Sequence, residues 1–586
     1  MFDPVHGVIH HFYQIHLATG AGHGPDYGHF VSRDFVNWAE LPVAIWNGLD
    51  SSETPARVTP YDNEAIFTGS AIVMDGAGPN GTKGVVQIYP GLCNKNDWPS
   101  CETGTLLAQA VPADYEQDTL LVNWTKPSYN PIVENTQRDP STPWLTPSGE
   151  YRLRTYDSKV YGAASASDML SGKWYEIGVS SDFRTCECPS FYPLPKSTPG
   201  FEKAYEDAGS SLPTHVHKTS CGGDWWQLGT YIPGAPKELG HFQATEGWED
   251  TFNQVRIDVG KFYASKDNVY PTIKQGETRR LNWGWAQVPP QSTQTLPREI
   301  TFNAAARTLQ QAPIEELKAL RQDTVYETKD VTLNNSSNIQ MNLKSGVAKQ
   351  SEVIVTFELP KTESTFGVSF GHPGSDEPGT KVTTYMKKTD MPGSDYNVTH
   401  YPVNTSPSVC ASACEADSKC KAWTYVVRGE PAGSGDCCLK SDIPCPVTSG
   451  GASQSCTSGS KTNTTLKNCG NTDTTSCEIH YVPPSSSSSV NEYYNVSVSC
   501  GSFDDTLRLL PEETDLELRI YSDATFLEAY FQQGRIAITA VATMDTSSDV
   551  TMYADSDVSV SSATAYSLRS IWVSEDEVRN AARVYH

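Results

Sequence analysis

Short apolar runs separated by turn residues dominate the first 305 positions of the chain. Apolar and aromatic stretches of a few residues alternate with Gly, Pro, Asn and Asp, at spacings that are typical of all-β folds. Long stretches with the helical period of 3.6 residues are almost absent. The pattern therefore predicts an all-β first domain over residues 1–305.

A weak internal repeat refines this prediction. Residues 29–38 read H-F-V-S-R-D-F-V-N-W and residues 164–174 read A-S-A-S-D-M-L-S-G-K-W, so both place Ser and Asp at a turn before a Trp. Residues 261–267, K-F-Y-A-S-K-D, begin in the same way. Repeated antiparallel units of this kind indicate propeller blades, although a sandwich of similar hairpins fits the same pattern.

The pattern changes after the first domain. Residues 312–321, A-P-I-E-E-L-K-A-L-R, have helical period with Pro early and acids in the first turn, which predicts a linker helix within residues 306–325. Strand-like alternation resumes in Val353–Phe370 and in Leu516–Ala540. We expect a second β domain in two parts, residues 326–371 and 491–586, separated by an insertion at residues 372–490.

The insertion holds most of the cysteines. Ten of the 15 Cys lie between Cys410 and Cys500, in runs that include C-A-S-A-C-E-A-D-S-K-C at 410–420 and C-C-L-K-S at 437–441. A Cys-x3-Cys spacing places two thiols on one face of a helix. Disulfides are expected here; a zinc site is the alternative, but no His pair accompanies the cysteines. Residues 447–489 are rich in Ser, Thr and Gly and predict a mobile linker.

Composition and charge limit the partners and the cellular compartment that we expect for the protein. The formal net charge of -25 disfavours nucleic acid, and no apolar run is long enough for a membrane span. Disulfides indicate an oxidising compartment, so we expect the secretory pathway, with an extracellular or vacuolar destination and a leader upstream of this sequence. Eight N-x-S/T sequences agree with that setting: Asn80, Asn123, Asn334, Asn335, Asn397, Asn404, Asn463 and Asn495.

Three acidic residues carry the candidate chemistry. Glu187 lies between two cysteines in R-T-C-E-C-P, Asp139 lies in Q-R-D-P, and Asp3 lies in F-D-P-V-H-G. Each alone fits a solvated turn residue. We expect Glu187 to be partly desolvated, with a pKa raised by burial and by its anionic neighbours, as a general acid requires. Arg138 is expected to keep Asp139 ionised.

The three motifs in this order resemble the signature of glycoside hydrolase family 32, roughly W-M-N-D-P-N-G, F-R-D-P and E-C-P-D. The resemblance implies a five-bladed β-propeller over residues 1–305, followed by a β-sandwich. It implies that Asp3 is the nucleophile, that Glu187 is the acid/base, and that Asp139 accepts hydrogen bonds from fructose hydroxyls. The motif L-P-R at 296–298 also matches, and Glu528 matches a structural acid of the sandwich. The Cys-rich insertion resembles a PAN/Apple module, for which a glycan or protein partner is expected.

Substrate contacts follow from the same resemblance. Gln14 matches a Gln in F-Y-Q, Phe67 and Thr68 match an aromatic-S/T pair, and Arg138 precedes the second acid. The alternative is that these residues belong to ordinary strands. The chain also departs from the family pattern, since the Asp and Lys that hold glucose in plant invertases have no clear match around residues 220–226.

The predicted function is a retaining β-fructofuranosidase that acts on sucrose and short fructans. A fructosyltransferase or a fructan exohydrolase would use the same residues, and a non-catalytic carbohydrate-binding protein is the third hypothesis. No cofactor and no metal are implied. Histidines crowd the first stretch, but strand period divides them between faces, which disfavours a metal cluster: His6, His10, His11, His16, His23 and His29.

Overall fold

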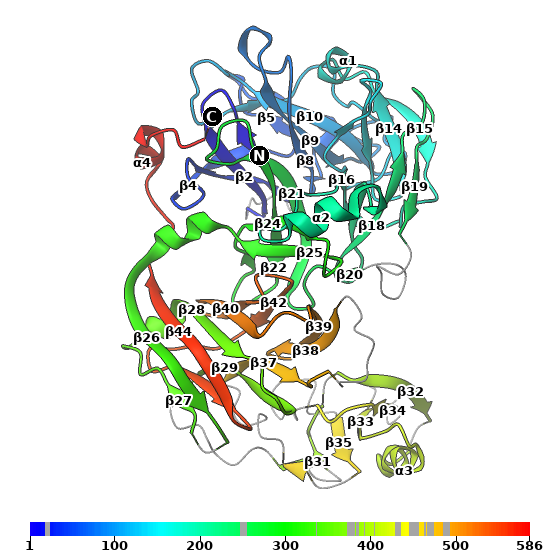
Figure 1. Cartoon of the computed structure of the whole chain (residues 1–586). Helices are drawn as coiled ribbons and strands as arrows, with labels where there is room; N and C mark the ends of the chain where they lie inside the picture. The colour runs from blue at the N-terminus through cyan, green and yellow to red at the C-terminus, as the bar shows by residue number, and fades with distance from the viewer. Residues whose placement is uncertain are drawn as a thin grey trace. The chain divides into compact units, whose positions relative to one another are not determined.

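Figure 1 presents a computed structural model of the chain, which describes residues 1–585 apart from 18–23, 246–254, 336, 372–380, 383–385, 392, 403–404, 428–434, 445–455, 462–463, 466–473 and 485–492. Strands predominate among the described residues, which confirms the all-β prediction. The chain divides into two compact units. The first comprises Met1–Val368, Cys477–Val541 and Thr551–His586, and the second comprises Ser369–Ser476 and Ala542–Val550.

Five consecutive antiparallel sheets occupy the described part of residues 1–313. Each sheet is built from strands that are neighbours in sequence. The strands are β1 (Phe2–Asp3), β2 (Val8–Ile15), β3 (Asp26–Ser32) and β4 (Trp38–Ile45); β7 (Ala65–Ile66), β8 (Ser70–Met74), β9 (Gly84–Leu92), β10 (Thr105–Pro112) and β11 (Trp124–Thr125); β12 (Trp144–Leu145), β13 (Tyr151–Arg154), β14 (Lys159–Ala163) and β15 (Tyr175–Val179); β16 (Glu187–Pro193), β17 (His215–Ser220), β18 (Asp224–Ile232), β19 (His241–Ala244) and β20 (Val255–Arg256); and β21 (Phe262–Pro271), β22 (Thr278–Ala286), β23 (Thr293–Gln294), β24 (Arg298–Asn303) and β25 (Thr308–Pro313).

Short elements fill the connections between these strands. The first copy of the repeat makes a turn, as predicted: Asp34 Oδ1 accepts the N–H groups of Val36 (2.9 Å) and Asn37 (2.8 Å). In the second copy of the repeat, Ser165 caps a short helix by accepting the Asp168 N–H. In the third copy the prediction is wrong, because Ser265 and Asp267 lie inside β21. The connecting elements are β5 (Leu49–Asp50), β6 (Arg57–Val58), η1 (Pro60–Asp62), η2 (Pro79–Gly81), α1 (Ala166–Leu170), α2 (Glu202–Ala208) and η3 (Gly209–Ser211).

Neighbouring sheets share their apolar cores. Val86 and Leu107 of the second sheet pack with Leu153 and Tyr161 of the third sheet and with Met169 of α1, the helix between β14 and β15. All five side chains are buried. Burying an aliphatic or aromatic side chain contributes about 1.5–3 kcal/mol, so each shared core stabilises the pairing of two sheets. The first sheet also contacts the last, because Phe2 and Ile9 lie in one cluster with Tyr270 and Leu281.

Two six-stranded sheets form the sandwich. Their orders are β26-β44-β28-β40-β41-β42 and β27-β43-β29-β37-β38-β39. A 3₁₀ helix, η4 (Glu315–Leu320), precedes them where the sequence predicts a linker helix. The sandwich strands are β26 (Arg321–Leu333), β27 (Ile339–Gln340), β28 (Gln350–Glu358), β29 (Ser364–Gly371), β37 (Thr475–Tyr481), β38 (Tyr494–Cys500), β39 (Phe503–Leu509), β40 (Asp515–Asp523), β41 (Phe526–Phe531), β42 (Ile536–Val541), β43 (Asp549–Ala554) and β44 (Val558–Leu568), with η5 (Val347–Lys349) between β27 and β28.

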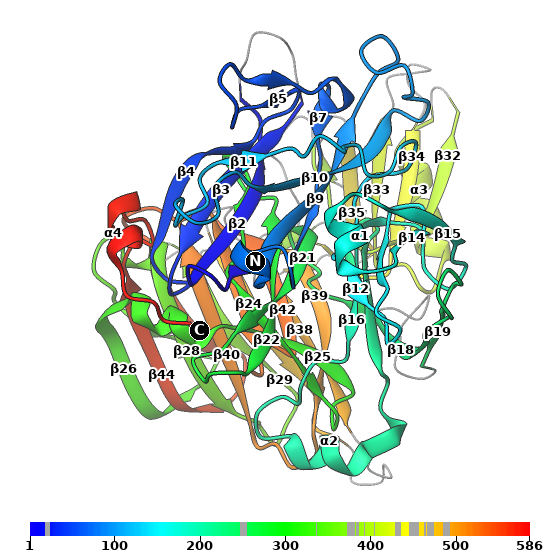
Figure 2. The ribbon, with the colours of Figure 1, turned by 90° about the horizontal axis from the view of Figure 1, so that it is seen from above.

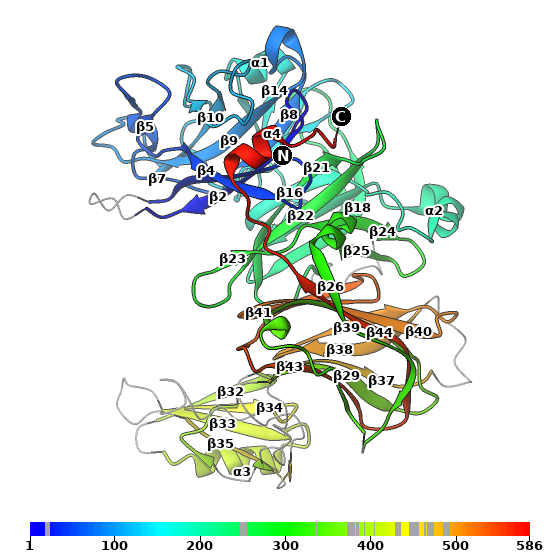
Figure 3. The same cartoon turned by 90° about the vertical axis from the view of Figure 1, so that its left-hand side faces the viewer.

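The inserted module is a small sheet covered by one helix, α3 (Ser408–Ala416), as Figure 3 shows. Cys410 and Cys414 are buried on α3 and form disulfides with Cys437 and Cys420, so the predicted two-thiol helix face is confirmed. The module sheet has the order β31-β35-β33-β34-β32. Its strands and a separate two-stranded ribbon of β30 and β36 are β30 (Lys381–Val382), β31 (Met386–Lys387), β32 (Asp395–Tyr401), β33 (Ala422–Val427), β34 (Gly435–Lys440), β35 (Cys456–Ser460) and β36 (Thr464–Thr465).

Two described segments correct the predicted linker at residues 447–489. β35 pairs with β33 inside the module sheet, and β37 pairs with β38 in the sandwich, where a disulfide joins Cys477 and Cys500. The Ser- and Thr-rich composition hid both strands, because alternation of small polar residues is a weak strand signal. In the same stretch β36 pairs with β30, residues 461, 474 and 482–484 form no helix or strand, and the other residues of the predicted linker lie outside the described part of the chain. The sandwich resumes at Thr475 rather than at 491.

A buried arginine joins the fifth sheet to the sandwich within the first unit. Arg298 of β24 is fully buried, and its guanidinium donates to Asp258 Oδ2 (2.9 Å) and to Glu528 Oε2 (2.8 Å) of β41. Thr539 of β42 donates to the same Asp258 oxygen (2.8 Å). The interpretation of Glu528 as a structural acid agrees with these contacts. A single cation therefore balances two buried carboxylates at this junction.

The C-terminal arm, residues 571–585, returns to the first sheet. It contains α4 (Glu575–Asn580). The Trp38 N–H donates to the Ile571 carbonyl (2.8 Å), and Val578 packs with Val8 and Val31. Arg583 Nη2 donates to the Pro4 carbonyl (2.7 Å) and its Nη1 to the Val5 carbonyl (3.1 Å). The arm thus braces the turn that follows Asp3.

Replacing Arg298 with Met should destabilise the fold strongly. The substitution leaves Asp258 and Glu528 as buried carboxylates without their cation, which costs about 3–5 kcal/mol of unfolding free energy. Urea denaturation followed by tryptophan fluorescence measures the loss. Lys274→Ala, which removes an exposed ion pair with Glu277, should leave the midpoint unchanged. An Arg298→Met protein as stable as the unaltered chain would contradict this role.

Candidate active site

Glu187 opens strand β16, and three covalent or polar constraints fix it. Its neighbour Cys186 is disulfide-bonded to Cys221 in the turn between β17 and β18. Glu187 Oε1 accepts from Arg138 Nη2 (2.6 Å), and Oε2 accepts from the Tyr263 hydroxyl (2.6 Å). The carboxylate is about one-third exposed, so it is reachable from solvent. Both of its oxygens are thus oriented by donors from other sheets or loops.

The pKa of Glu187 differs from the expectation. Burial raises it, as predicted, but the hydrogen bonds from Tyr263 and Arg138 together with the Arg138 charge outweigh burial. The net pKa therefore lies below the ordinary value, and the predicted increase is wrong for the ligand-free protein. No sequence pattern indicates Tyr263 as a partner, because Tyr263 lies 76 positions away in the chain.

Asp139 is nearly buried, with 4% of its surface exposed, and has a left-handed backbone (φ 59°). Its Oδ2 accepts the Cys188 N–H (3.1 Å), and Arg138 Nε lies 3.8 Å from the same oxygen. Burial raises the pKa of Asp139, while Cys188, Lys266 and Arg138 lower it, and the net pKa is raised. Arg138 thus acts in the predicted direction, but burial is the larger effect.

Asp3 lies at the end of β1 and has no exposed surface. Its Oδ1 accepts from the Val5 N–H (3.0 Å) and the Tyr115 hydroxyl (2.7 Å). Its Oδ2 accepts from the His6 N–H (3.2 Å) and lies 2.6 Å from His6 Nδ1. Because a carboxylate only accepts, His6 Nδ1 carries the hydrogen. Neither His6 nor Tyr115 was singled out from the sequence as a partner of this acid.

Strand contacts bring the three acids toward one region. β1 contacts both β9 and β21, and β21 contacts β16, so the strands that carry Asp3, Tyr263 and Glu187 are successive neighbours. Figure 2 shows β2, β9, β16 and β21 around the N-terminus, toward the middle of the five sheets. Asp139 belongs to the same region because it accepts a hydrogen bond from the backbone N–H of Cys188, the residue after Glu187.

Two β-bulges aim the site side chains. The register of β16 shifts after Glu187 and that of β21 shifts after Tyr263. The next residues, Cys188 (φ 45°) and Ala264 (φ 50°), are left-handed, a conformation that costs about 1–3 kcal/mol for such residues. Bulges re-aim side chains beside functional sites. The backbone strain thus lies directly after Glu187 and Tyr263, whose side chains are hydrogen-bonded to each other.

A buried ion pair supports both bulges. Lys218 Nζ lies 3.0 Å from Asp224 Oδ2 and donates to the carbonyls of Ser265 (2.6 Å) and Cys188 (3.3 Å). Asp224 accepts the N–H groups of Ala264 (3.0 Å) and Ser265 (2.7 Å). Both members of this pair are buried.

The predicted substrate residues form a second group. Gln14 of β2 donates through Nε2 to Thr68 Oγ1 (3.0 Å), and the half-buried Phe67 accepts through its carbonyl from the Tyr27 hydroxyl (2.6 Å). Ser70 of the same F-T-G-S motif donates to the carbonyl of Pro140, next to Asp139, and accepts from Lys266 Nζ (3.0 Å). The motif therefore continues into the region of the acids.

Sequence reasoning missed several residues that hold the acids in place. Tyr263 and Lys266 lie inside K-F-Y-A-S-K-D, the third copy of the internal repeat, which does not indicate their partners. His6 directly follows the D-P-V motif, and its adjacency to Asp3 was the available signal. Tyr115 lies in an irregular loop between β10 and β11, where no pattern marks it.

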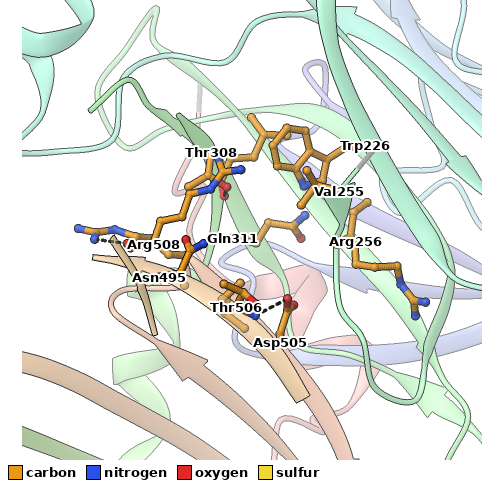
Figure 4. Close-up of a pocket in the computed structure, with 14 residues that line it drawn as sticks. Trp226, Val255, Arg256, Thr308, Gln311, Asn495, Asp505, Thr506 and Arg508 are labelled. Carbon is orange, nitrogen blue, oxygen red and sulfur yellow. Dashed lines mark hydrogen bonds between the residues drawn. The ribbon is translucent and has the colours of Figure 1, made fainter. Parts of the chain in front are cut away.

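A separate cavity of about 230 Å³ lies between the fourth and fifth sheets and the sandwich of the same unit (Figure 4). None of the predicted site residues lines it. Its polar lining includes Arg256, Asp505 and Arg508, and burial raises the pKa of Asp505 to about 6. Among the described residues, no group of three or more His, Cys, Asp or Glu side chains is arranged to hold a metal ion.

Comparison with known proteins agrees with the motif analysis. The profile of the "Glycosyl hydrolases family 32 N-terminal domain" matches residues 2–315, and that of the PAN domain matches residues 389–440. An insoluble isoenzyme of β-fructofuranosidase from Arabidopsis thaliana is 31% identical over 366 residues, covering 58% of this chain and 60% of the relative. An acid β-fructofuranosidase from Vicia faba is 30% identical, covering 61% and 54%. The chain thus spans little more than half the length of these relatives.

Solved structures share the fold. Fructan 1-exohydrolase IIa from Cichorium intybus superposes with a TM-score of 0.57 at 20% identity, covering 97% of this chain and 94% of that structure. An exo-inulinase from Aspergillus awamori gives a TM-score of 0.54 at 16% identity, with the same coverage. These likenesses support an arrangement of propeller and sandwich. In the described part of the chain, no helix has the length and apolarity to cross a membrane.

Proposed function

Because the chain belongs to glycosyl hydrolase family 32, we propose that it is a retaining β-fructofuranosidase that removes the terminal non-reducing fructosyl residue of sucrose and short fructans. The observation that carries the proposal is the placement of Glu187, held by Arg138 and Tyr263 beside Asp139. The five sheets are then the five blades of the propeller, with the inner strands β1, β16 and β21 supplying the site.

The reaction takes two steps. In the first, a carboxylate oxygen of Asp3 bonds to the anomeric carbon of fructose while Glu187 gives its proton to the departing glycosidic oxygen, so glucose leaves. In the second, Glu187 takes a proton from water, the water oxygen bonds to the same carbon, and the Asp3 carboxylate is released. The stereochemistry is retained because the carbon is attacked twice from opposite sides.

The remaining residues bind and orient the fructosyl unit. Asp139 accepts hydrogen bonds from fructose hydroxyls, and Arg138 balances the charge of Asp139 and Glu187. The rim of the same subsite is formed by Gln14, Phe67 and Thr68. Fructan exohydrolysis remains a second candidate, because a fructan 6-exohydrolase from Triticum aestivum is 27% identical over 400 residues.

The proposed cellular location rests on the disulfides and on the names of the relatives. Five disulfides occur among the described residues, which suits an oxidising compartment. One relative carries the name "insoluble isoenzyme" and another, from a Rosa hybrid cultivar, is described as vacuolar. We place this protein in the secretory pathway, with an extracellular or vacuolar destination.

Asp3→Ala and Glu187→Ala should each lower sucrose turnover by about 10³-fold or more, because one removes the nucleophile and the other the proton donor. Released glucose and fructose measure the rate, and equal amounts indicate hydrolysis whereas excess glucose with a trisaccharide indicates fructosyl transfer. Glu176→Ala, on an exposed carboxylate of β15, should have no effect. Near-normal turnover in either site variant would refute the assigned roles.

Tyr263→Phe should move the alkaline limb of the kcat/KM profile to higher pH. Glu187 must be protonated to act as the acid, so the rate falls as pH rises through its pKa. The Tyr263 hydrogen bond lowers that pKa, and its removal raises it. Tyr175→Phe, which breaks a similar bond to Glu150, is the matched control and should leave the limb in place. A limb that moves to lower pH, or not at all, would contradict the assignment.

Deleting the inserted module should preserve sucrose cleavage. Gly371 ends β29 and Thr475 begins β37, and these strands are neighbours in one sheet, so a short Gly-Ser linker can join them. We expect kcat/KM of a 372–474 deletion to stay within about threefold of the full chain, since none of the proposed site residues lies in the module. A deletion variant that unfolds in one sharp thermal transition but cleaves no sucrose would show that the module takes part.

A further inference from the structure

The carboxylate of Asp3 is saturated with hydrogen bonds from the protein. Its two oxygens offer about four lone-pair sites, and four donors occupy them: the N–H groups of Val5 and His6, the His6 imidazole and the Tyr115 hydroxyl. The side chain has no exposed surface. An oxygen that accepts two hydrogen bonds and touches no solvent cannot reach a sugar carbon, so one donor must leave before attack.

Three of the four donors belong to one braced turn. The Gly7 N–H donates to the Asp3 carbonyl (2.9 Å), which closes the turn. Arg583 holds the carbonyls of Pro4 and Val5, and Arg33 Nη1 holds the carbonyl of His6 (2.7 Å). The left-handed Gly7 (φ 68°) packs so closely that a Cβ there would lie 2.6 Å from Arg583. The donors of this turn therefore stay in place.

Tyr115 is different, because it comes from a loop 112 positions away in the chain. It is half-buried, and its neighbours Asp114 and Glu116 are exposed. Its ring stacks on the His6 ring, with centroids 5.7 Å apart at 22°. Burial and the Asp3 charge raise the pKa of Tyr115, so the hydroxyl keeps its proton and remains a donor. Its ring also packs against the apolar core of the first two sheets, and its hydroxyl also interacts with the Val85 backbone. Rotation of this one side chain would break these contacts but would uncover Oδ1 without disturbing the turn.

We propose that Tyr115 is a removable cap on the nucleophile: the fructosyl unit displaces its hydroxyl from Oδ1, which is the oxygen that attacks, while His6 remains on Oδ2 as the positioning residue. This inference rests on the proposed function. Tyr115 thus opposes substrate binding by the strength of one hydrogen bond to a charged group, and His6 fixes the carboxylate plane during attack.

Tyr115→Phe tests the cap. It keeps the ring stacked on His6 but removes the hydrogen bond, so KM for sucrose should fall about tenfold while kcat stays within about threefold. Binding of fructose, measured by isothermal titration calorimetry, should strengthen by the same factor. Tyr129→Phe, which removes a hydroxyl bonded to Gln109, is the matched control and should change neither quantity. Unchanged or weaker binding by Tyr115→Phe would overturn the proposal.

Substitution of His6 should have the opposite effect, with a change in kcat and not in KM. His6→Ala should lower kcat about tenfold with little change in KM, and His6→Asn, whose amide N–H can take the place of Nδ1–H, should restore most of kcat. A loss confined to KM, or no rescue by Asn, would overturn the role of His6. Thermal unfolding midpoints equal to the unaltered chain show that each variant is folded. If the unaltered protein neither binds fructose nor cleaves sucrose, the proposed function itself fails, and that outcome is distinct from a failure of the cap.

Discussion

The ion pair between Lys218 and Asp224 connects the two strands that carry Glu187 and Tyr263. It links the carbonyl of Cys188 on β16 to backbone groups of Ala264 and Ser265 on β21. Both strands bulge there, and both place a left-handed residue directly after a site residue. A buried pair with its hydrogen-bonding groups satisfied can hold strained backbone that an apolar contact would let relax. The pair thus holds the backbone directly after Glu187 and Tyr263.

The same use of buried charge recurs where the fifth sheet meets the sandwich. Arg298 is surrounded by Asp258, Glu528 and the Tyr530 hydroxyl, with no exposed surface. Guanidinium suits this position because its planar set of donors can satisfy several acceptors at once. The fifth sheet also carries Tyr263 and Lys266, so the junction fixes a strand that forms part of the site. The sandwich thereby supports catalytic geometry although it contributes no proposed catalytic group.

Local patterns were enough to predict most of the strands and the helix face with two thiols, and they singled out the acids of the proposed site. Motifs such as R-D-P and E-C-P report on residues adjacent in sequence, and so does the spacing of Cys410 and Cys414. The partners that lower the pKa of Glu187 are Arg138 and Tyr263, which lie 49 and 76 positions away in the chain. Nothing in the sequence indicates which tyrosine reaches Glu187. For that reason the predicted direction of its pKa was wrong although its burial was correctly expected. The strands β35 and β37 escaped detection for a different reason, because their small polar residues lack apolar alternation.

The C-terminal arm has a consequence for the timing of biosynthesis. Arg583 and Val5, which share a hydrogen bond, lie 578 positions apart. At about 5–20 residues per second, a ribosome that has made the first sheet needs roughly half a minute to two minutes more before it adds that arginine. Until then the turn after Asp3 lacks the two hydrogen bonds that Arg583 donates to the carbonyls of Pro4 and Val5. The nascent chain can therefore assemble its early sheets while the turn that holds Asp3 still lacks its contacts with Arg583.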